Sequence, residues 1–429
     1  MRRGETASNR LTTPLRVAAI GLIVIGGGFY LMTEQCTTSQ AAKPTTNYIS
    51  AVRPRSQPQN TKTSSGAQYL IFQIFTYPIT PQELPASQVD SIVQTIVNTI
   101  GSTGAKGRKL GFAVGPMCFD MTDSQLIELI DDSFTVAEKY NVAVMFHIDD
   151  SMFWESRQDL WSQHQNVEWV SWSGAEGGLR TLPWYSGPAL GPQMCYNSPG
   201  IESAISTLVG QVVGSEIQKD VAQLETQGKS DLFAGIITGW ETQLPDVTPP
   251  DGYCALTNLG YSATNPPADM DATLVGVVHD FLQFWDQQFV AAGIDSDKLY
   301  THIATVPPGT DDNHAPLSVG FNSDCHAGFT AYGSEGASFP QIYQALVAEG
   351  AQPWGVSEGS NIYPPNAQPT GSGLPDLPMA QYLAGAYNHG ATYVNLFGWQ
   401  ATGTPFYNVL VDPSAIKTYR KFLKGKKFQ

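Results

Sequence analysis

Two glutamates stand just beyond short apolar runs, where carboxyl groups are well placed for acid–base or nucleophilic chemistry. Glu241 comes after the run 232–238 (LFAGIIT) with two residues between, and Glu358 comes after the run 354–356 and Ser357. A glutamate in either place alone is as typical of a helix cap or an ion pair. Two such glutamates are more specific, because burial can keep one carboxyl group protonated while hydrogen bonds keep the other ionised.

Other polar and aromatic side chains lie beside the same kind of apolar run. Tyr332 and His302 are candidates to hold one of the carboxyl groups ionised by a hydrogen bond. The full set comprises His147, Asp149, Asp150, Trp154, Trp240, His302, Asp324, His326, Tyr332, Asn395 and Trp399.

The elements that must position these residues alternate along the chain. Strands are predicted over 69–75, 110–114, 142–148, 232–238, 299–305, 327–331, 354–356 and 391–397. Apolar residues at helical spacing predict helices over 89–100, 124–140, 201–224, 272–292, 340–349, 379–389 and 414–423. Thr122 or Asp123 is the expected cap of the second helix. No clear helix precedes the sixth strand.

Strand–helix alternation predicts a parallel sheet covered by helices, and eight units fit an α/β protein of the (β/α)8 TIM-barrel class. A doubly wound open sheet is disfavoured, because no glycine-rich turn follows the first strand. Long insertions follow strands three, four and five, at about 149–199, 242–269 and 307–325. In a barrel those insertions lie at the carboxyl ends of the strands, where sites are built.

With glutamates after strands four and seven, the sequence resembles the large superfamily of retaining glycoside hydrolases built on (β/α)8 barrels. The resemblance covers about 69–423 and rests on strand order and the two glutamates. It implies that Glu241 is the catalytic acid/base and Glu358 the catalytic nucleophile. Many members carry Asn immediately before the acid/base, whereas this chain has Trp240 there. No closer family is identified.

Retaining hydrolysis needs two carboxyl groups about 5–5.5 Å apart across the glycosidic bond. Sugar rings present apolar faces, so four tryptophans are candidates for stacking, with ordinary packing as the alternative. Polar side chains from the set above are candidates to bind hydroxyl groups. The predicted substrate-binding residues are His147, Asp149, Asp150, Trp154, Trp184, Trp240, His302, His326, Tyr332, Asn395 and Trp399.

Two other functions stay open at this point. A metal-dependent barrel hydrolase would use His147, Asp149, His302, Asp324 and His326, since His-x-Asp on a strand places both side chains on one side. Against it, the first strand has no His-x-His motif. A non-catalytic carbohydrate- or cell-wall-binding barrel would keep the tryptophans and lose one carboxylate. We expect no metal and no other cofactor.

Net charge and composition limit the classes of molecule that this protein is expected to bind. The net charge of −15 disfavours nucleic acid, whose phosphates would be repelled, and is compatible with a neutral carbohydrate. Only Arg157 and Arg180 lie in the long loop after strand three, which disfavours acidic sugars. Of the five cysteines, Cys195 and Cys254 are a candidate disulfide pair, although sequence alone does not settle the pairing. The sequence does not indicate an oligomeric state.

The N-terminus reads as a targeting segment. Arginines precede the uncharged run 17–32, which predicts a signal anchor or signal peptide with residues 1–16 as a cytoplasmic basic tail. Residues 33–68 are rich in Ser, Thr, Gln, Pro and Lys and predict a flexible linker. We therefore expect an extracytoplasmic catalytic domain over 69–429, secreted or anchored to the membrane only through the N-terminal segment.

Overall fold

The computed structural model describes residues 67–75, 84–105, 107–175, 179–180, 190–244, 253–306, 311–333, 338–350, 353–362 and 377–428. The predicted basic tail, the apolar segment 17–32 and nearly all of the predicted linker lie outside these ranges. Within them, no helix has both the length and the apolar character needed to cross a membrane.

Eight parallel strands form the central sheet, and all eight were predicted from the sequence. They are β1 (Gln68–Ile74), β2 (Arg108–Val114), β3 (Ala143–Ile148), β6 (Phe233–Thr238), β7 (Leu299–Thr301), β8 (Ala327–Tyr332), β9 (Trp354–Ser360) and β10 (Ala391–Leu396). The order is β7-β6-β3-β2-β1-β10-β9-β8. Parallel bridges from Tyr300 to His326 and from Ile303 to Phe329 join β7 to β8 and close the ring. The fold is the expected (β/α)8 barrel.

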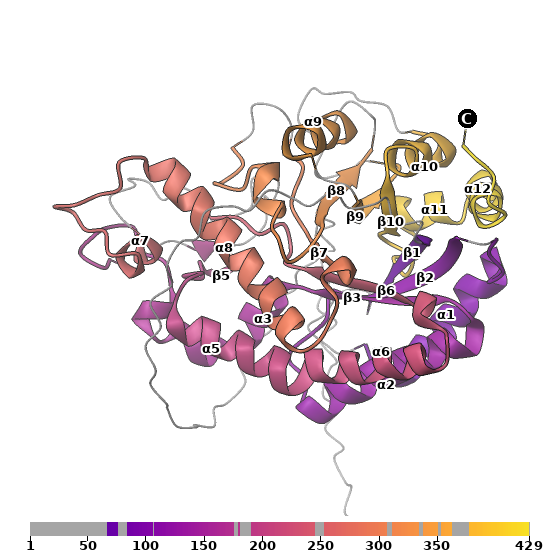
Figure 1. Cartoon of the computed structure of the whole chain (residues 1–429), viewed down its shortest axis with the longest axis horizontal. Helices are drawn as coiled ribbons and strands as arrows, with labels where there is room; N and C mark the ends of the chain where they lie inside the picture. Colours follow the sequence, from indigo (N-terminus) through magenta and orange to yellow (C-terminus); the bar gives the residue numbers. More distant parts are fainter. Residues whose placement is uncertain are drawn as a thin grey trace, which may run out of the picture.

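Helices surround the ring. Figure 1 places α2, α5 and α6 along one side of the sheet (the lower edge of the view) and α9, α10 and α12 on the opposite side. The helices are α1 (Ala86–Ile100), α2 (Asp123–Tyr140), α3 (Asp150–Ser156), α4 (Gln158–Trp161), α5 (Pro199–Leu208), α6 (Gly214–Thr226), α7 (Cys254–Asn258), α8 (Met270–Ala291), α9 (Phe339–Glu349), α10 (Met379–Tyr387), α11 (Pro405–Leu410) and α12 (Pro413–Leu423). A short antiparallel pair, β4 (Leu179–Arg180) and β5 (Leu190–Pro192), belongs to the insertion after β3.

Local sequence explains how these helices begin and break. Thr122 caps α2 in a capping box, because its hydroxyl accepts from the N–H of Gln125 while the Gln125 side chain accepts from the N–H of Thr122. The helix predicted over 201–224 is interrupted by a π-helical turn at Val209–Val213. Gly210 lies within this turn and Gly214 follows it, and glycine weakens a helix interior. Between β7 and β8 the described chain forms only the 3-10 turn Leu317–Gly320.

The core has two layers, one on each face of the barrel wall. Outward-facing strand residues such as Phe72, Phe146 and Val356 pack against the helices. Inward-facing residues form a smaller cluster: Tyr69, Ile71, Ala113, Ala143, Met145, Ala234, Ile237, Tyr300 and Tyr393. Further along β1, β3 and β9 toward their carboxyl ends, the inward-facing side chains become polar, at Gln73, His147 and Glu358. Inside the barrel, a polar layer at the carboxyl ends of the strands therefore lies above an apolar layer.

Candidate active site

The turn after β6 holds Glu241 in an unusual conformation. Gly239 has φ +82° and Glu241 itself has φ +47°, a region that non-glycine residues rarely occupy. Asp150 holds both neighbours of Glu241: its carboxylate accepts from the N–H of Trp240 (2.7 Å) and from the hydroxyl of Thr242 (3.3 Å). Such backbone strain persists where the surroundings fix it, and it concentrates at functional sites. The Glu241 side chain is buried.

A bulge in β9 aims Glu358 at the barrel interior. Across β8 and β9, Phe329 pairs with Val356 and Thr330 pairs with Glu358, so Ser357 is the extra residue. The Ser357 hydroxyl faces the interior, where it bonds the carbonyl of Thr301 (2.7 Å). After the bulge Glu358 also faces inward, where Tyr332 contacts it. Glu358 therefore lies within the strand rather than after it, because β9 runs to Ser360 and not to the predicted residue 356.

Thr330 connects the two glutamates. Its hydroxyl donates a 2.5 Å hydrogen bond to Oε1 of Glu241, and it is the register partner of Glu358 in the neighbouring strand. Neighbouring strands lie about 5 Å apart, and the two glutamates are near enough for the charge of Glu241 to act on the Glu358 carboxyl group. The structure thus brings together the two predicted catalytic residues, from the fourth and seventh barrel strands in chain order.

Electrostatics couple the two carboxyl groups. Burial and the charge of Glu241 raise the pKa of Glu358 well above its ordinary value. The Tyr332 hydroxyl opposes this, since it donates a 2.6 Å hydrogen bond to Oε1 of Glu358, and the amide of Gln73 acts in the same direction. Burial and the charge of Glu358 in turn raise the pKa of Tyr332, which keeps its proton and remains a donor. The two carboxyl groups are therefore electrostatically coupled, and their simultaneous ionisation is disfavoured.

Two predicted histidines form one chain with Glu241. His147, on β3, and His302, just after β7, meet at 3.1 Å between Nε2 of His147 and Nδ1 of His302. Nε2 of His302 lies 2.9 Å from the Thr330 hydroxyl that bonds Glu241. Burial lowers the pKa of His147 to about 4 and that of His302 well below its usual range, so both imidazoles are neutral near pH 7.

Asn395, predicted to bind substrate, supports a residue that the sequence analysis missed. Its amide donates to Oε1 of Gln73 (2.7 Å) and to the carbonyl of Ser357 (2.8 Å), which orients Gln73 beside Glu358. Gln73 and Thr330 are both buried. A polar side chain inside the apolar run 69–75 was the available signal for Gln73. Threonine is common in strands, so Thr330 gave no comparable signal.

Several predicted substrate-binding residues make contacts within the fold. Asp149 caps α3 by accepting from the N–H groups of Ser151 and Met152 (2.7 and 2.9 Å), and Asp150 fixes the Glu241 turn. Trp154 donates to the carbonyl of Pro192 (2.8 Å), and the ring of Trp399 packs against Phe72 at 5.1 Å. Both tryptophans are buried, as is Trp240, so none presents an open face. Trp184 lies outside the described residues.

His326 and Asp324 lie at the wrong end of the barrel for the predicted site. His326 precedes β8, so it belongs to the amino ends of the strands, where its ring lies 3.5 Å from Asp297. Asp324 accepts from Gln283 and Gln287 of α8 (2.8 and 3.3 Å). The five-residue metal site considered above is therefore not assembled.

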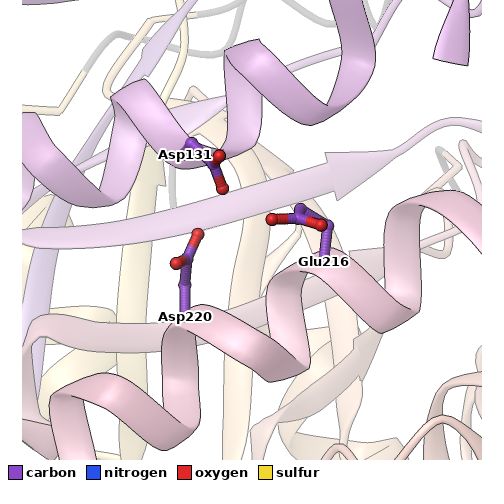
Figure 2. Close-up of side chains that lie close together, drawn as sticks. All are labelled: Asp131, Glu216 and Asp220. Atoms are coloured by element: carbon purple, nitrogen blue, oxygen red, sulfur yellow. The ribbon is translucent and has the colours of Figure 1, made fainter. Parts of the chain in front are cut away.

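One other group of carboxylates lies on the outer helices. Among the described residues, the one set of three or more His, Cys, Asp or Glu with ligand atoms mutually within 4.8 Å is Asp131, Glu216 and Asp220. Figure 2 shows the three carboxyl groups converging between α2 and α6. The ammonium of Lys219 bonds Asp131 (3.2 Å) and Glu216, so a side-chain cation already balances part of the negative charge of this cluster.

Comparison with known proteins gives structural neighbours only. No protein-family model and no curated protein matches the sequence. The structure is similar to (β/α)8-barrel glycoside hydrolases. A catalytic mutant of a GH42 beta-galactosidase from G. stearothermophilus gives a TM-score of 0.46 at 10% identity, covering 85% of this chain and 58% of that one. An endo-beta-1,4-mannanase from Thermotoga petrophila gives 0.43 at 8% identity, covering 84% and 77%.

A GH26 beta-mannanase from Bacteroides ovatus gives a TM-score of 0.33 at 9% identity, covering 84% of this chain and 88% of that one. The neighbours also include a sugar phosphate isomerase/epimerase from Parabacteroides distasonis, at 0.37 and 9%. The chain spans somewhat more than half the length of the GH42 structure. Because the identities and TM-scores are this low, a function can be argued only from the geometry of the site.

Proposed function

We propose that the protein is a glycoside hydrolase that cleaves a neutral carbohydrate by a retaining, double-displacement mechanism. Glu358 is the nucleophile and Glu241 the acid/base. One observation carries the proposal: Thr330 bonds Glu241 at 2.5 Å and is the strand partner of Glu358. The charge of Glu241 also acts on Glu358. This supports the short carboxyl spacing of about 5–5.5 Å that retaining enzymes use, rather than the 6.5–9.5 Å of inverting ones.

In the first step a carboxylate oxygen of Glu358 attacks the anomeric carbon. The bond to the leaving oxygen breaks, and Glu241 gives that oxygen its proton. The product is a glycosyl ester on Glu358 and an ionised Glu241. In the second step Glu241 takes a proton from water, whose oxygen attacks the anomeric carbon and releases the Glu358 carboxylate.

The surroundings of each glutamate suit its role. Glu358 must be ionised to attack, and the Tyr332 hydroxyl and the Gln73 amide stabilise its ionised form. Burial and the charge of Glu241 raise the pKa of Glu358, so the two carboxyl groups resist being ionised together. This favours a proton on one of the pair, and in the proposed mechanism Glu241 supplies it as the acid. Once Glu358 is esterified its charge is gone, so Glu241 ionises more readily and acts as the base in the second step.

The substrate class follows from charge. The chain carries −15, and two buried carboxyl groups occupy the site, so an anionic sugar would be repelled. Neutral sugars avoid this cost and satisfy buried polar groups through their hydroxyls.

A fluorosugar trap tests the nucleophile. We expect a 2-deoxy-2-fluoro glycoside with a good leaving group, of a sugar found active in a screen of neutral nitrophenyl glycosides, to leave a covalent adduct. Peptide mass spectrometry should place the adduct on Glu358. NMR of the first-formed product should show the anomeric configuration of the substrate. Adduct formation at another residue, or inverted product, contradicts the mechanism.

Variants separate the two roles. We expect Glu358→Ala to abolish turnover and azide to restore it as a glycosyl azide of inverted configuration. Glu241→Gln should slow substrates with poor leaving groups by several orders of magnitude, and activated aryl glycosides less. Glu128→Gln, at an exposed position of α2, is the matched control and should match the wild type. If Glu358→Ala remains active without azide, the assignment is wrong.

We also propose that the barrel acts outside the cytoplasm, tethered through residues 17–32. The basic residues before that run and the polar stretch after it support this. Protease added to intact cells should degrade the barrel of the full chain, and removal of residues 1–32 should keep the protein inside. Full protection of the barrel in intact cells would contradict export.

A further inference from the structure

A buried chain of hydrogen bonds runs from β3 to Glu241. Nε2 of His147 lies 3.1 Å from Nδ1 of His302, and Nε2 of His302 lies 2.9 Å from Oγ1 of Thr330. Oγ1 of Thr330 lies 2.5 Å from Oε1 of Glu241. Both histidines are fully buried, and Thr330 is 5% exposed, so water does not replace these contacts. The chemistry of hydrolysis uses none of the three side chains directly.

A backbone carbonyl fixes the direction of this chain. Nε2 of His147 lies 3.0 Å from the carbonyl oxygen of Gly239, which can only accept. Nε2 of His147 therefore carries hydrogen, and Nδ1 of His302, which faces the same nitrogen, must accept. Because a neutral imidazole has one N–H, His302 carries its hydrogen on Nε2 and donates it to Thr330. The single hydroxyl hydrogen of Thr330 then goes to Glu241.

The opposite direction meets a repulsion. If Glu241 donated through Oε1, Thr330 would donate to His302, and His302 would donate through Nδ1 to His147. Nε2 of His147 would then turn a lone pair toward the lone pairs of the Gly239 carbonyl. The His147 side chain is fully buried, so solvent does not offset that repulsion, and the first direction is favoured.

We propose that His147, His302 and Thr330 are positioning residues that make Oε1 of Glu241 a permanent acceptor and confine the catalytic proton to Oε2. This rests on the proposed function of Glu241. It means that Oε2 is the oxygen that protonates the leaving group and later deprotonates water. The Gly239 carbonyl, two residues before Glu241, sets the direction of the hydrogen bonds in this chain. It belongs to the same turn in which Glu241 has a positive φ.

Histidine tautomers test the proposal without any substrate. Nitrogen-15 NMR of the full chain labelled at its imidazoles should give the Nε2–H pattern for His147 and His302, unchanged between pH 6 and 8. Signals are assigned with His147→Gln and His302→Gln, whose amide nitrogen replaces the Nε2 donor. An Nδ1–H tautomer of His302, or an imidazolium at pH 7, overturns the proposal even if the enzyme is active.

Activity provides the second test. Thr330→Val removes the donor at nearly constant volume, so the ionised form of Glu241 loses a hydrogen bond. The alkaline limb of the kcat/KM–pH profile should then move up by about one pH unit, and kcat should fall about tenfold. The groups that face this region and also titrate are Glu358, Tyr332 and Asp149, and they are unchanged in the variant.

Matched variants separate positioning from folding. Thr330→Ser keeps the hydroxyl and should keep the wild-type profile. His302→Gln should retain most of the activity that His302→Leu loses. Thr392→Val, whose hydroxyl bonds Tyr300 at the far end of β10, should leave the profile in place. A Thr330→Val profile identical to the wild type overturns the proposal. An inactive wild type refutes the proposed function instead, and the tautomers still decide the direction of the chain.

Discussion

The carboxylate of Asp150 accepts a 2.7 Å hydrogen bond from the backbone N–H of Trp240, the residue just before Glu241. It also accepts from Thr242, the residue just after. Sequence suggested that Asp150 binds substrate hydroxyls. In the structure it shapes the turn that presents Glu241. The two roles predict different results for variants of Asp150.

We expect Asp150→Ala to lower the free energy of unfolding by about 2–3 kcal/mol, because it leaves the buried N–H of Trp240 without its acceptor. Urea denaturation measures the change. It should also lower kcat, since Glu241 is no longer held at φ +47°. Asp150→Asn keeps an acceptor oxygen and should remain near the wild type in both. If Asp150→Asn instead raises KM strongly at unchanged stability, Asp150 contacts substrate after all.

The Tyr332 hydroxyl should govern the acid limb of the pH profile. Tyr332→Phe removes a 2.6 Å hydrogen bond to the ionised form of Glu358, so the pKa of Glu358, already raised by burial, rises further. A hydrogen bond to a charged group contributes about 1.5–3 kcal/mol, which corresponds to about one to two pH units. The acid limb of kcat/KM should move up by that amount.

Tyr343→Phe is the matched control for this variant. The Tyr343 hydroxyl donates to the carbonyl of Gly385 (2.7 Å) on the outer helices, away from both glutamates. Its removal should leave the profile unchanged. An acid limb that stays in place in Tyr332→Phe, with only kcat reduced, would mean that Tyr332 acts on the substrate rather than on Glu358.

Sequence predicted the barrel well because buried parallel strands read as short apolar runs and the helices carry one apolar face. It also placed Glu241 and Glu358 toward the same end of the barrel, since the carboxyl ends of parallel strands share that end, although Glu358 lies within β9 rather than after it. The error at His326 was avoidable, because a residue that precedes a strand lies at the opposite end. The strand predicted over 299–305 ends at Thr301 in the structure. The sequence did not indicate this earlier end, because residues 302–305 continue the polar and apolar pattern of the strand.

What sequence could not supply is register. The bulge at Ser357 turns Glu358 inward, and no local signal marks it, since the extra residue is defined only against β8 and β10. Thr330 owes its importance to the same register, because it is the strand partner of Glu358. The chain through His147 and His302 joins positions 155 residues apart, and only the closed barrel brings them together.

Asp220 should make the protein less stable as the pH rises. Burial and the charge of Asp131 raise its pKa from the ordinary 3.8 to about 7. The folded state therefore holds a proton that the unfolded chain gives up, so stability falls between about pH 4 and pH 7 and stays low above. Asp220 is 8% exposed, but it lies on the outer helices in a cluster of exposed and half-buried charges that solvent screens. The expected loss is therefore about 1–2 kcal/mol.

Asp220→Asn removes this titration and keeps the size of the side chain. Urea denaturation should give a gain of about 1–2 kcal/mol at pH 8 and almost none at pH 4. A gain of equal size at both pH values would point to better packing or helix propensity. Loss of stability at pH 8 would mean that the ionised carboxylate is needed there, as it would be if the cluster of Figure 2 bound a cation.

Cys195 and Cys254, the candidate disulfide pair, are free buried thiols in the structure. They should form a disulfide when the protein folds in a glutathione redox buffer. Nδ2 of Asn258 contacts both sulfurs, at 3.4 and 4.0 Å, and Cys254 lies close enough to raise the pKa of the Cys195 thiol. Glutathione disulfide would take two electrons and two protons from the pair and leave two reduced glutathiones. Closing a loop between positions 195 and 254 contributes about 2–4 kcal/mol.

The rate of disulfide formation, before and after folding, should distinguish this buried pair from surface thiols. Burial, Cys254 and Glu168 raise the pKa of the Cys195 thiol well above its ordinary value, so the folded reduced protein should oxidise slowly at neutral pH. Refolding from urea with glutathione should oxidise the pair within the refolding time, and peptide mapping should show one peptide linking the two positions. Cys195→Ser should lose both that peptide and the gain in stability. Alkylation of both thiols after such refolding would contradict the pairing.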